Sequence, residues 1–350
     1  MKKNLFGYTL QSLTDEFLSL GQSKYRSKQI FTWIYQKKVF DFDAMTDISK
    51  DFRAVLNRDY CLDLPMIHTR QDASDGTIKL LLEMEDGAKV EAVLMPYNYG
   101  DAICVSSQVG CNMGCAFCAS GLFKRSRNLT AAEMMGELMV MNEILSEFGR
   151  RVTHIVVMGT GEPFDNYDNV MSFIKTANDQ FGLAIGARHI TVSTCGIPEG
   201  IRKYGKEGIQ INLAISLHAP NDETRNQIMP ISKAYPLDQL ISAIQEYEKD
   251  AGRRVTFEYI LLRDVNDSLS HADMLADLIH DNGIFAYVNL IPYNEVAEKT
   301  FRRSSPVAIK AFHDRLMKRG INATIRKEFG SDIDAACGQL RSKTERRGGQ

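Results

Sequence analysis

The chain has 350 residues, of which 44% are apolar and 25% are charged, and its formal net charge is −2. This ordinary composition excludes a disordered, collagen-like or coiled-coil protein, and no stretch approaches the about 18 apolar residues of a membrane helix. The first residues are basic but lack the apolar core of a secretory signal, so we expect a cytoplasmic protein.

Residues 1–65 are predicted to form a helical module. Apolar residues recur at helical spacing through 24–35 with basic residues between them, and a second amphipathic run follows near Phe52. Two apolar runs, 77–84 and 88–95, then flank the turn sequence Glu85-Asp-Gly and predict a β-hairpin. We therefore divide this part into an accessory helical domain over 1–65, whose basic face is available for nucleic acid, and a hairpin extension over 66–100.

From residue 101 onward, strand-like and helix-like runs alternate. The strand-like runs are 103–107, 153–158, 189–194, 209–216, 255–261 and 285–291. The helix-like runs are 130–147, 167–179, 237–251, 270–280 and 306–319, and we expect a shorter helix between the third and fourth strands. Six such units in series predict an α/β fold with a parallel sheet, either a partial barrel or a doubly wound sheet. One more strand, 322–326, precedes a loop that contains Cys337.

Polar and glycine-rich sequences follow most of these strands. They are the cysteine-rich segment 111–118, Gly159-Thr-Gly-Glu-Pro, Ser193-Thr-Cys-Gly, Ser216-Leu-His-Ala and Pro292-Tyr-Asn294. In parallel folds the functional residues gather where strands end. We therefore expect these segments to meet at one edge of the sheet.

The strongest local motif is Cys111-Asn-Met-Gly-Cys115-Ala-Phe-Cys118. Disulfides are rare inside cells, so three thiols this close favour a metal centre. Structural zinc usually has four protein ligands, and no second cysteine or histidine pair follows nearby. A 4Fe–4S cluster held by three thiolates fits better, since its fourth iron stays open to another ligand. A zinc module is the alternative.

The cysteine spacing, on a loop after the first strand of the series, resembles the radical S-adenosylmethionine (SAM) superfamily. This resemblance implies a partial (βα)6 barrel over 101–330, with SAM bound to the open iron of the cluster through Cys111, Cys115 and Cys118. Its other strand-end motifs imply SAM-binding residues, namely Gly161, Glu162, Ser193, Ser216, Leu217, His218 and Asn294. As an isolated motif, Gly-Glu-Pro is more often only a turn.

Further motifs resemble the RlmN/Cfr family of RNA methyltransferases within this superfamily. They include Val105-Ser-Ser-Gln-Val-Gly-Cys111, Met158-Gly-Thr-Gly-Glu-Pro-Phe, Val288-Asn-Leu-Ile-Pro and Asp332-Ile-Asp-Ala-Ala-Cys-Gly-Gln-Leu, in one register from about residue 20 to residue 341. The resemblance implies methylation of an adenine in the peptidyl-transferase centre of 23S rRNA and of an adenine in tRNAs. Gly-Glu-Pro-Phe and the Val-Gly before Cys111 favour the C2-methylating branch over the Cfr-like C8 branch.

The family chemistry implies three further residues and two molecules of SAM per turnover. Cys337, in a catalytic loop and basic tail over 331–350, takes a methyl group from the first SAM. A radical from the second SAM removes a hydrogen atom from that group, and the resulting carbon adds to C2. Glu91 matches the base that takes the C2 proton, and Cys104 matches the thiol that releases the product through a transient disulfide. By themselves, Glu91 could be a solvent-facing carboxylate and Cys104 a buried small side chain.

The implied partners are 23S rRNA, tRNA and an electron donor such as flavodoxin or ferredoxin. Both ends of the chain are basic, +5 over residues 1–40 and +7 over 301–350, around a middle of −14. Basic ends can contact a polyanion, although solvated surface explains them equally well. An alternative from another functional class is a non-catalytic RNA-binding protein in which a metal bound to the three cysteines only stabilises the fold.

Overall fold

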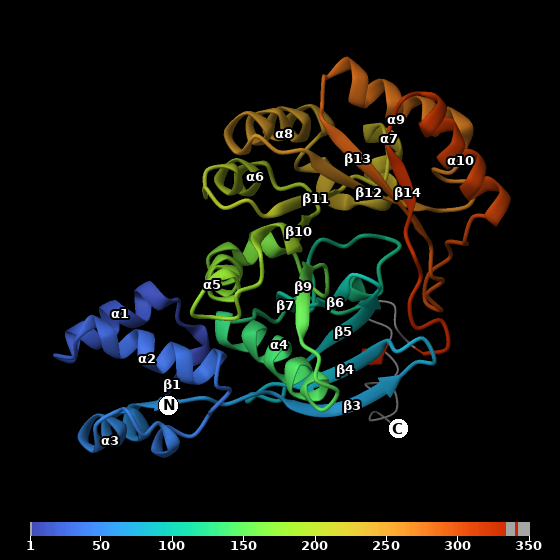
Figure 1. Ribbon diagram of the computed structural model, residues 1–350. Helices are drawn as coiled ribbons and strands as arrows, with labels where there is room; N and C mark the ends of the chain where they lie inside the picture. The colour runs from blue at the N-terminus through green and yellow to red at the C-terminus, as the bar shows by residue number, and fades with distance from the viewer. Residues whose placement is uncertain (1, 334–339, 342–350) are drawn as a thin grey trace.

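The computed structural model describes residues 2–333, 340 and 341 (Figure 1). Its central element is a ten-stranded sheet with the strand order β14-β13-β12-β11-β10-β9-β6-β5-β4-β3. The parallel strands are β6 (Gly100–Cys104), β9 (Val152–Val157), β10 (Ile190–Thr194), β11 (Asn212–Ser216), β12 (Val255–Leu261), β13 (Ala286–Pro292) and β14 (Ala323–Ile325). Within the described residues, no helix is both long and apolar enough to span a membrane.

A helix follows each of the first six parallel strands. These helices are α4 (Ala131–Ser146), α5 (Tyr167–Asn178), α6 (Pro198–Gly205), α7 (Asp222–Ile228) with α8 (Leu237–Ala251), α9 (Leu269–Asp281) and α10 (Pro306–Lys318). The strands lie in chain order without a reversal, so right-handed crossovers place successive helices on the same side of the sheet. Figure 1 shows α4, α5, α6 and α8 one above another along that outer side. The topology is thus a partial barrel and not a doubly wound sheet.

The predicted hairpin continues this sheet as an antiparallel extension. Its strands β4 (Ile78–Glu83) and β5 (Lys89–Tyr97) pair with each other, and β5 then pairs antiparallel with β6. A further strand, β3 (Met66–Asp72), pairs with β4 and was not predicted. This strand is mostly exposed at the edge of the sheet, so it lacks the alternation of apolar and polar residues that marks a half-buried strand.

The N-terminal module contains α1 (Leu10–Ser19), α2 (Lys24–Tyr35) and α3 (Lys50–Asp59). Two short strands, β1 (Lys3–Asn4) and β2 (Tyr60–Cys61), pair in parallel and bring its two ends together. Phe17 and Phe52 pack edge to face with ring centroids 5.1 Å apart. The module lies beside α4 and α5 (Figure 1), where the Thr176 hydroxyl donates to the Tyr8 carbonyl at 3.1 Å.

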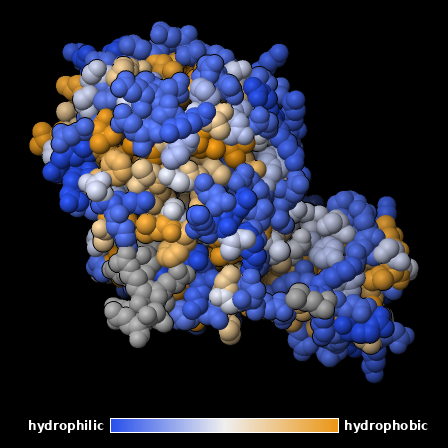
Figure 2. All heavy atoms as spheres, turned by 180° about the vertical axis from the view of Figure 1, so that it is seen from behind, coloured by the Kyte–Doolittle hydropathy of each residue, from blue (hydrophilic) through white to orange (hydrophobic). Residues whose placement is uncertain are grey.

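A large apolar core lies between the sheet and its helices and extends into the N-terminal module. A second apolar cluster surrounds the cysteine-rich loop, and a third lies on one face of β5 and β6. Figure 2, seen from behind, shows a tract of hydrophobic surface across the middle of the larger body, bordered by hydrophilic side chains. The larger body therefore has an apolar region that is not covered by helices.

Candidate active site

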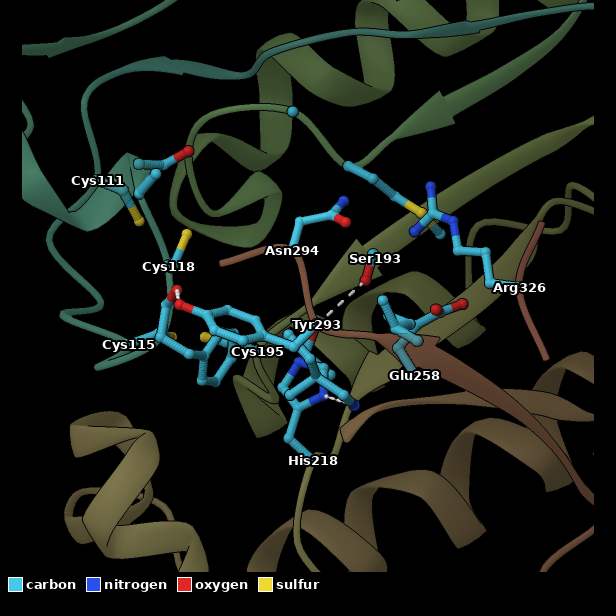
Figure 3. A pocket seen from close by; sticks show the side chains of 18 of the residues that line it. Cys111, Cys115, Cys118, Ser193, Cys195, His218, Glu258, Tyr293, Asn294 and Arg326 are labelled. Atoms are coloured by element: carbon cyan, nitrogen blue, oxygen red, sulfur yellow. Dashed lines mark hydrogen bonds between the residues drawn. The ribbon is translucent and has the colours of Figure 1, made fainter. Parts of the chain in front are cut away.

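A cavity of about 330 Å³ lies inside the partial barrel. Its lining includes nine predicted site residues, namely Cys111, Cys115, Cys118, Gly161, Glu162, Ser193, Ser216, His218 and Asn294. In Figure 3 the three cysteines lie on one side of the cavity and Glu258 and Arg326 on the other, with Ser193 and Asn294 between them. The carboxyl ends of the parallel strands thus meet at one site, as the strand-end motifs predicted.

The cysteine-rich loop is held by backbone bonds at both of its ends. Short strands β7 (Gln108–Val109) and β8 (Arg127–Asn128) pair antiparallel and close its base. Gly110 has φ +80°, and a Cβ there would overlap the Lys124 carbonyl, so glycine is required before Cys111. The Cys111 N–H donates to the Phe123 carbonyl at 3.0 Å. The loop therefore presents its thiols in one fixed arrangement.

Burial keeps the thiols of Cys111 and Cys115 neutral unless a cation is bound beside them. Burial raises the pKa of Cys111 to about 11, and burial together with the neighbouring thiols Cys118 and Cys111 also raises the pKa of Cys115. A metal cation would reverse both effects by stabilising thiolates. In the described part of the chain, no group of three His, Cys, Asp or Glu side chains is close enough to hold a single metal ion. The three cysteines nevertheless line one cavity, and a multi-iron cluster is larger than one ion.

The Gly-Glu-Pro segment follows β9 and approaches the loop closely. Gly161 has φ +116°, and a Cβ there would lie 2.7 Å from side-chain atoms of Ser107 and Gln108. Glu162 is buried, and its carboxylate accepts the Phe164 N–H at 2.9 Å and the Cys195 N–H at 2.7 Å. Burial raises the pKa of Glu162, although these hydrogen bonds oppose that shift. Backbone groups thus fix the carboxylate at the cavity wall.

The remaining strand-end residues surround the middle of the cavity. The hydroxyl oxygens of Ser193 and Ser216, on adjacent strands, are 3.5 Å apart. Burial lowers the pKa of His218 to about 3, and its Nδ1 accepts the Ile260 N–H at 3.0 Å. The neutral ring therefore carries its proton on Nε2 and can donate from there. Leu217 differs from the others because its side chain is packed in the main core.

Glu91 and Cys104 come from the antiparallel extension and β6. Val93 of β5 faces Cys104 of β6, and side chains two positions apart share a face of a strand. Glu91 and Cys104 are therefore diagonal neighbours on one face, a relation with Cα atoms roughly 7–8 Å apart. Both are buried, and the same face carries Val93 and Met95, which line the cavity. The structure thus brings both predicted residues next to the site.

The chain after β14 crosses the open side of the barrel to reach the extension. Phe329 packs edge to face on Tyr97 with ring centroids 4.7 Å apart, and the Gly330 N–H donates to Asp75 at 2.9 Å. Beyond it, the Arg341 N–H donates to Oε1 of Glu91 at 2.7 Å. Cys337 lies outside the described residues, but the chain on both sides of it is anchored on the extension.

Comparison with known proteins identifies the family. Residues 3–62 match the model of the ribosomal RNA large subunit methyltransferase N-terminal domain, and residues 105–278 match the radical SAM superfamily. Proteins named probable dual-specificity RNA methyltransferase RlmN are 51% identical in Enterococcus faecalis and 50% identical in Streptococcus equi subsp. zooepidemicus. The alignments cover 98% of this chain and 97% and 96% of those proteins. The chain belongs to the RlmN family.

A solved structure supports this assignment. The crystal structure of a radical SAM methyltransferase from Sphaerobacter thermophilus is 43% identical, covers 96% of this chain and 98% of its own, and superposes with a TM-score of 0.90. The predicted fold class and the predicted radical SAM methyltransferase family are confirmed. Because these relatives are named as methyltransferases, the alternative of a non-catalytic RNA-binding protein is disfavoured. The domain boundaries and the role of each site residue stay predictions.

Three charged residues at the site of this RlmN-family protein were not predicted. Lys79 is fully buried on β4, with its Nζ 2.9 Å from Oε2 of Glu91. Arg225 is buried beneath the cysteine-rich loop and donates to the Cys195 carbonyl at 2.7 Å. Glu258 lines the cavity, and burial raises its pKa. Lys79 and Glu258 each had a visible signal, as a lone charged residue within an apolar strand sequence, whereas Arg225 had none.

Lys124, Arg125 and Arg127 beside the cysteine-rich loop are candidates for contacts with RNA phosphates, but both arginines have acidic partners. Arg127 forms ion pairs with Asp86 of the β4–β5 turn and Glu133 of α4, and Arg125 pairs with Asp165 at 3.0 Å. Lys124 is exposed beside them. These arginines therefore connect the loop, the extension and the barrel through ion pairs, and Lys124 is the better candidate for a phosphate contact.

Proposed function

We propose that this RlmN-family protein is a dual-specificity RNA methyltransferase that acts on C2 of adenine. The expected targets are an adenine in the peptidyl-transferase centre of 23S rRNA and an adenine in tRNAs. One observation carries the proposal: the cavity that holds the predicted cluster and SAM residues is continuous with the face that carries Glu91 and Cys104. A simple polar transfer is unsuited to C2, whose hydrogen is not acidic, and radical chemistry removes that barrier.

The cavity residues fit the expected cofactors. Cys111, Cys115 and Cys118 would hold one 4Fe–4S cluster, with SAM at its open iron. The SAM contacts would come from Gly161 and Glu162 for the amino group, and from Ser193, Ser216, His218, Asn294 and the backbone of Leu217. When bound, two SAM molecules supply the methyl group and the one-electron cleavage that removes a hydrogen atom from it. An electron donor such as flavodoxin or ferredoxin would feed the cluster.

The chain's own residues would then carry the group transfer. Cys337 Sγ holds the methyl group as a thioether, and after hydrogen removal its carbon bonds to C2. Glu91 takes the C2 proton while the bonding pair stays in the ring. The unpaired electron left on the ring would need a one-electron acceptor, which a cluster held by Cys111, Cys115 and Cys118 would supply in its oxidised state. RNA is then bound covalently to Cys337.

Release requires a second thiol. The Cys104 thiolate attacks Cys337 Sγ, so the S–S bond forms and the S–C bond breaks. The freed methylene carbon keeps the bonding pair and takes a proton to become the methyl group of the product. A thiol reductant must reopen the disulfide before the next turnover. The diagonal placement of Cys104 and Glu91 on one face supports this division of work.

The RNA substrate must reach a cavity inside the barrel. A base in a duplex cannot do so unless it is unstacked and flipped out of its helix, so we expect recognition of a loop or a strained single strand. The basic N-terminal module and Lys124 are candidates for phosphate contacts, whose affinity would fall steeply with salt. A cytoplasmic location agrees with rRNA and tRNA substrates and is part of this proposal.

The test is anaerobic turnover with reductant, SAM and RNA, followed by mass spectrometry of the nucleosides. We expect 2-methyladenosine in both RNAs. The variant Cys337→Ala should keep its iron and sulfide but form no methylated product, and continued turnover would refute the covalent scheme. A product methylated at C8 would instead place the protein with the Cfr branch.

A further inference from the structure

The ion pair between Lys79 and Glu91 differs from the other ion pairs in the described residues. The two side chains are 0% and 4% exposed. In each of the other ion pairs of the described chain, the more exposed partner is at least 28% exposed. Burial of two charges costs several kcal/mol per ion in desolvation, and apolar replacements are often as stable. Stability alone therefore does not explain this pair.

Both carboxylate oxygens of Glu91 are held from different directions. Oε2 faces the Lys79 ammonium at 2.9 Å, and Oε1 accepts the Arg341 N–H at 2.7 Å. Lys79 lies opposite Val93 in the β4–β5 register, and Val93 lies opposite Cys104 in the β5–β6 register. Lys79, Glu91 and Cys104 thus share one face across three neighbouring strands. The same carboxylate anchors the chain four residues after Cys337.

Two other buried carboxylates show what burial does where backbone N–H groups are the hydrogen-bond partners. Burial raises the pKa of Glu137 and Glu162. Their hydrogen bonds come from the backbone N–H of Ser106, Phe164 and Cys195. A carboxyl group that is neutral cannot accept a proton. A general base on this face therefore needs a charge that offsets desolvation, and the Lys79 ammonium supplies it.

We propose that Lys79 is a positioning residue that keeps Glu91 ionised and aimed at the C-terminal segment. This inference rests on the proposed role of Glu91 as the base. In that step the C2–H bond breaks, its electron pair stays in the purine ring, and the proton forms an O–H bond on Glu91. Lys79 does not touch the substrate; it acts through the carboxylate.

The charged and titratable groups around Glu91 limit what else could set its charge. Among the described residues, those that strand register and hydrogen bonds place there are Lys79 on β4, Cys104 on β6, Arg341 in the C-terminal segment, and Glu137 on α4, which reaches the Ser106 N–H beside it. The Arg341 guanidinium lies over the Phe123 ring, 4.6 Å from its centroid, so that residue reaches Glu91 through its backbone. Lys79 is accordingly the ammonium in direct contact with the carboxylate.

The test replaces Lys79 with Met, which has a similar length and no charge, and with Arg, which keeps a cation. Lys89→Met is the matched control, because Lys89 pairs with Glu83 in the same hairpin but at the surface. Each full-length protein is reconstituted anaerobically. Iron and sulfide content, Cys337 methylation, RNA–protein adduct and methyladenosine are then followed from pH 6 to pH 9.

We expect Lys79→Met to keep its cluster and its Cys337 methylation but to form less of the stable RNA adduct, because the C2 proton must leave before that adduct is complete. Its product formation should fall most at the acid end of this range, by up to about tenfold for each unit by which the carboxylate pKa rises, and should recover toward pH 9. The acid limb of its pH–rate profile should move up by about 1–3 pH units, because an adjacent opposite charge shifts a carboxylate by that amount. Lys79→Arg should restore most of the rate, and Lys89→Met should match the original protein.

If Lys79→Met lowered the reaction rate equally at every pH and did not move the pH–rate profile, Lys79 would have only a structural role. Wild-type turnover of Lys79→Met would also overturn the inference. The variant Glu91→Gln distinguishes a failure of this inference from a failure of the proposed function. Full turnover by Glu91→Gln would show that Glu91 is not the base. If Lys79→Met does not fold, the double variant Lys79→Met/Glu91→Gln leaves a neutral pair. It should fold and be no slower than Glu91→Gln, and a slower double variant would contradict the assignment.

Discussion

The parallel barrel and the antiparallel extension contribute to the same cavity by different means. In the barrel, residues such as Glu162 and His218 follow strand ends and are fixed largely by backbone hydrogen bonds. In the extension, Lys79 and Glu91 lie within strands and are fixed by each other. The barrel side should therefore be sensitive to changes in backbone conformation, and the extension side to the loss of one partner of a pair.

The largest effect should come from the cysteine-rich loop on the barrel side. We expect Cys115→Ala to lose nearly all iron and sulfide, and with them SAM cleavage and RNA methylation. Metal analysis and product assays check this. Cys61→Ala, in the N-terminal module, is the control and should keep both. A Cys115→Ala protein with a full cluster would remove Cys115 from the ligand set.

Cys104→Ala, on the extension side, should have a smaller effect, because it blocks product release but not SAM cleavage. Cys337 methylation and SAM cleavage should still occur once per protein, after which RNA stays attached because no thiol releases it. Denaturing gels with labelled RNA measure the adduct. Cys195→Ala shortens another buried cysteine and should not trap RNA. Normal product release by Cys104→Ala would exclude Cys104 as the resolving thiol.

Backbone geometry is tested by Gly161→Ala. The left-handed conformation adds about 1–3 kcal/mol of strain for a residue with a side chain, and the new Cβ would also collide with Ser107 and Gln108. SAM affinity should fall at least about tenfold, if SAM binding loses about 1.4 kcal/mol or more. Gly208→Ala has φ +70° and no atoms within 4 Å, so its affinity should be unchanged. Equal affinities for the two variants would contradict the proposed approach of SAM to this turn.

The smallest effect is expected where the two regions meet. Arg127 joins the extension to α4 through Asp86 and Glu133, but its side chain is 31% exposed, so Arg127→Met should lower the free energy of unfolding by less than about 1 kcal/mol. Arg58→Met removes an exposed pair with the adjacent Asp59 and should have no measurable effect. Chemical denaturation measures both. A loss of several kcal/mol would mean that this contact holds the two regions together.

Much of the barrel could be predicted from the sequence. Val255–Leu261 and Leu237–Ala251 lie where their apolar periodicity placed them, since buried parallel strands and amphipathic helices have strong patterns. The fourth strand was expected from residue 209 but begins at Asn212, after a turn at Gly208 with φ +70°. Such boundaries depend on backbone hydrogen bonds that residue types do not specify.

The sequence by itself determined the cysteine-rich loop, the strand-end motifs and the family, because short-range spacing is written directly in the chain. The tertiary structure alone decided that the helices lie on one side of an open barrel, that β3 extends the sheet, and that Glu91 meets Lys79 and Arg341. Those contacts join residues 12 and 250 positions apart. The register of three strands and the path of the C-terminal segment bring them together, and no local pattern encodes either.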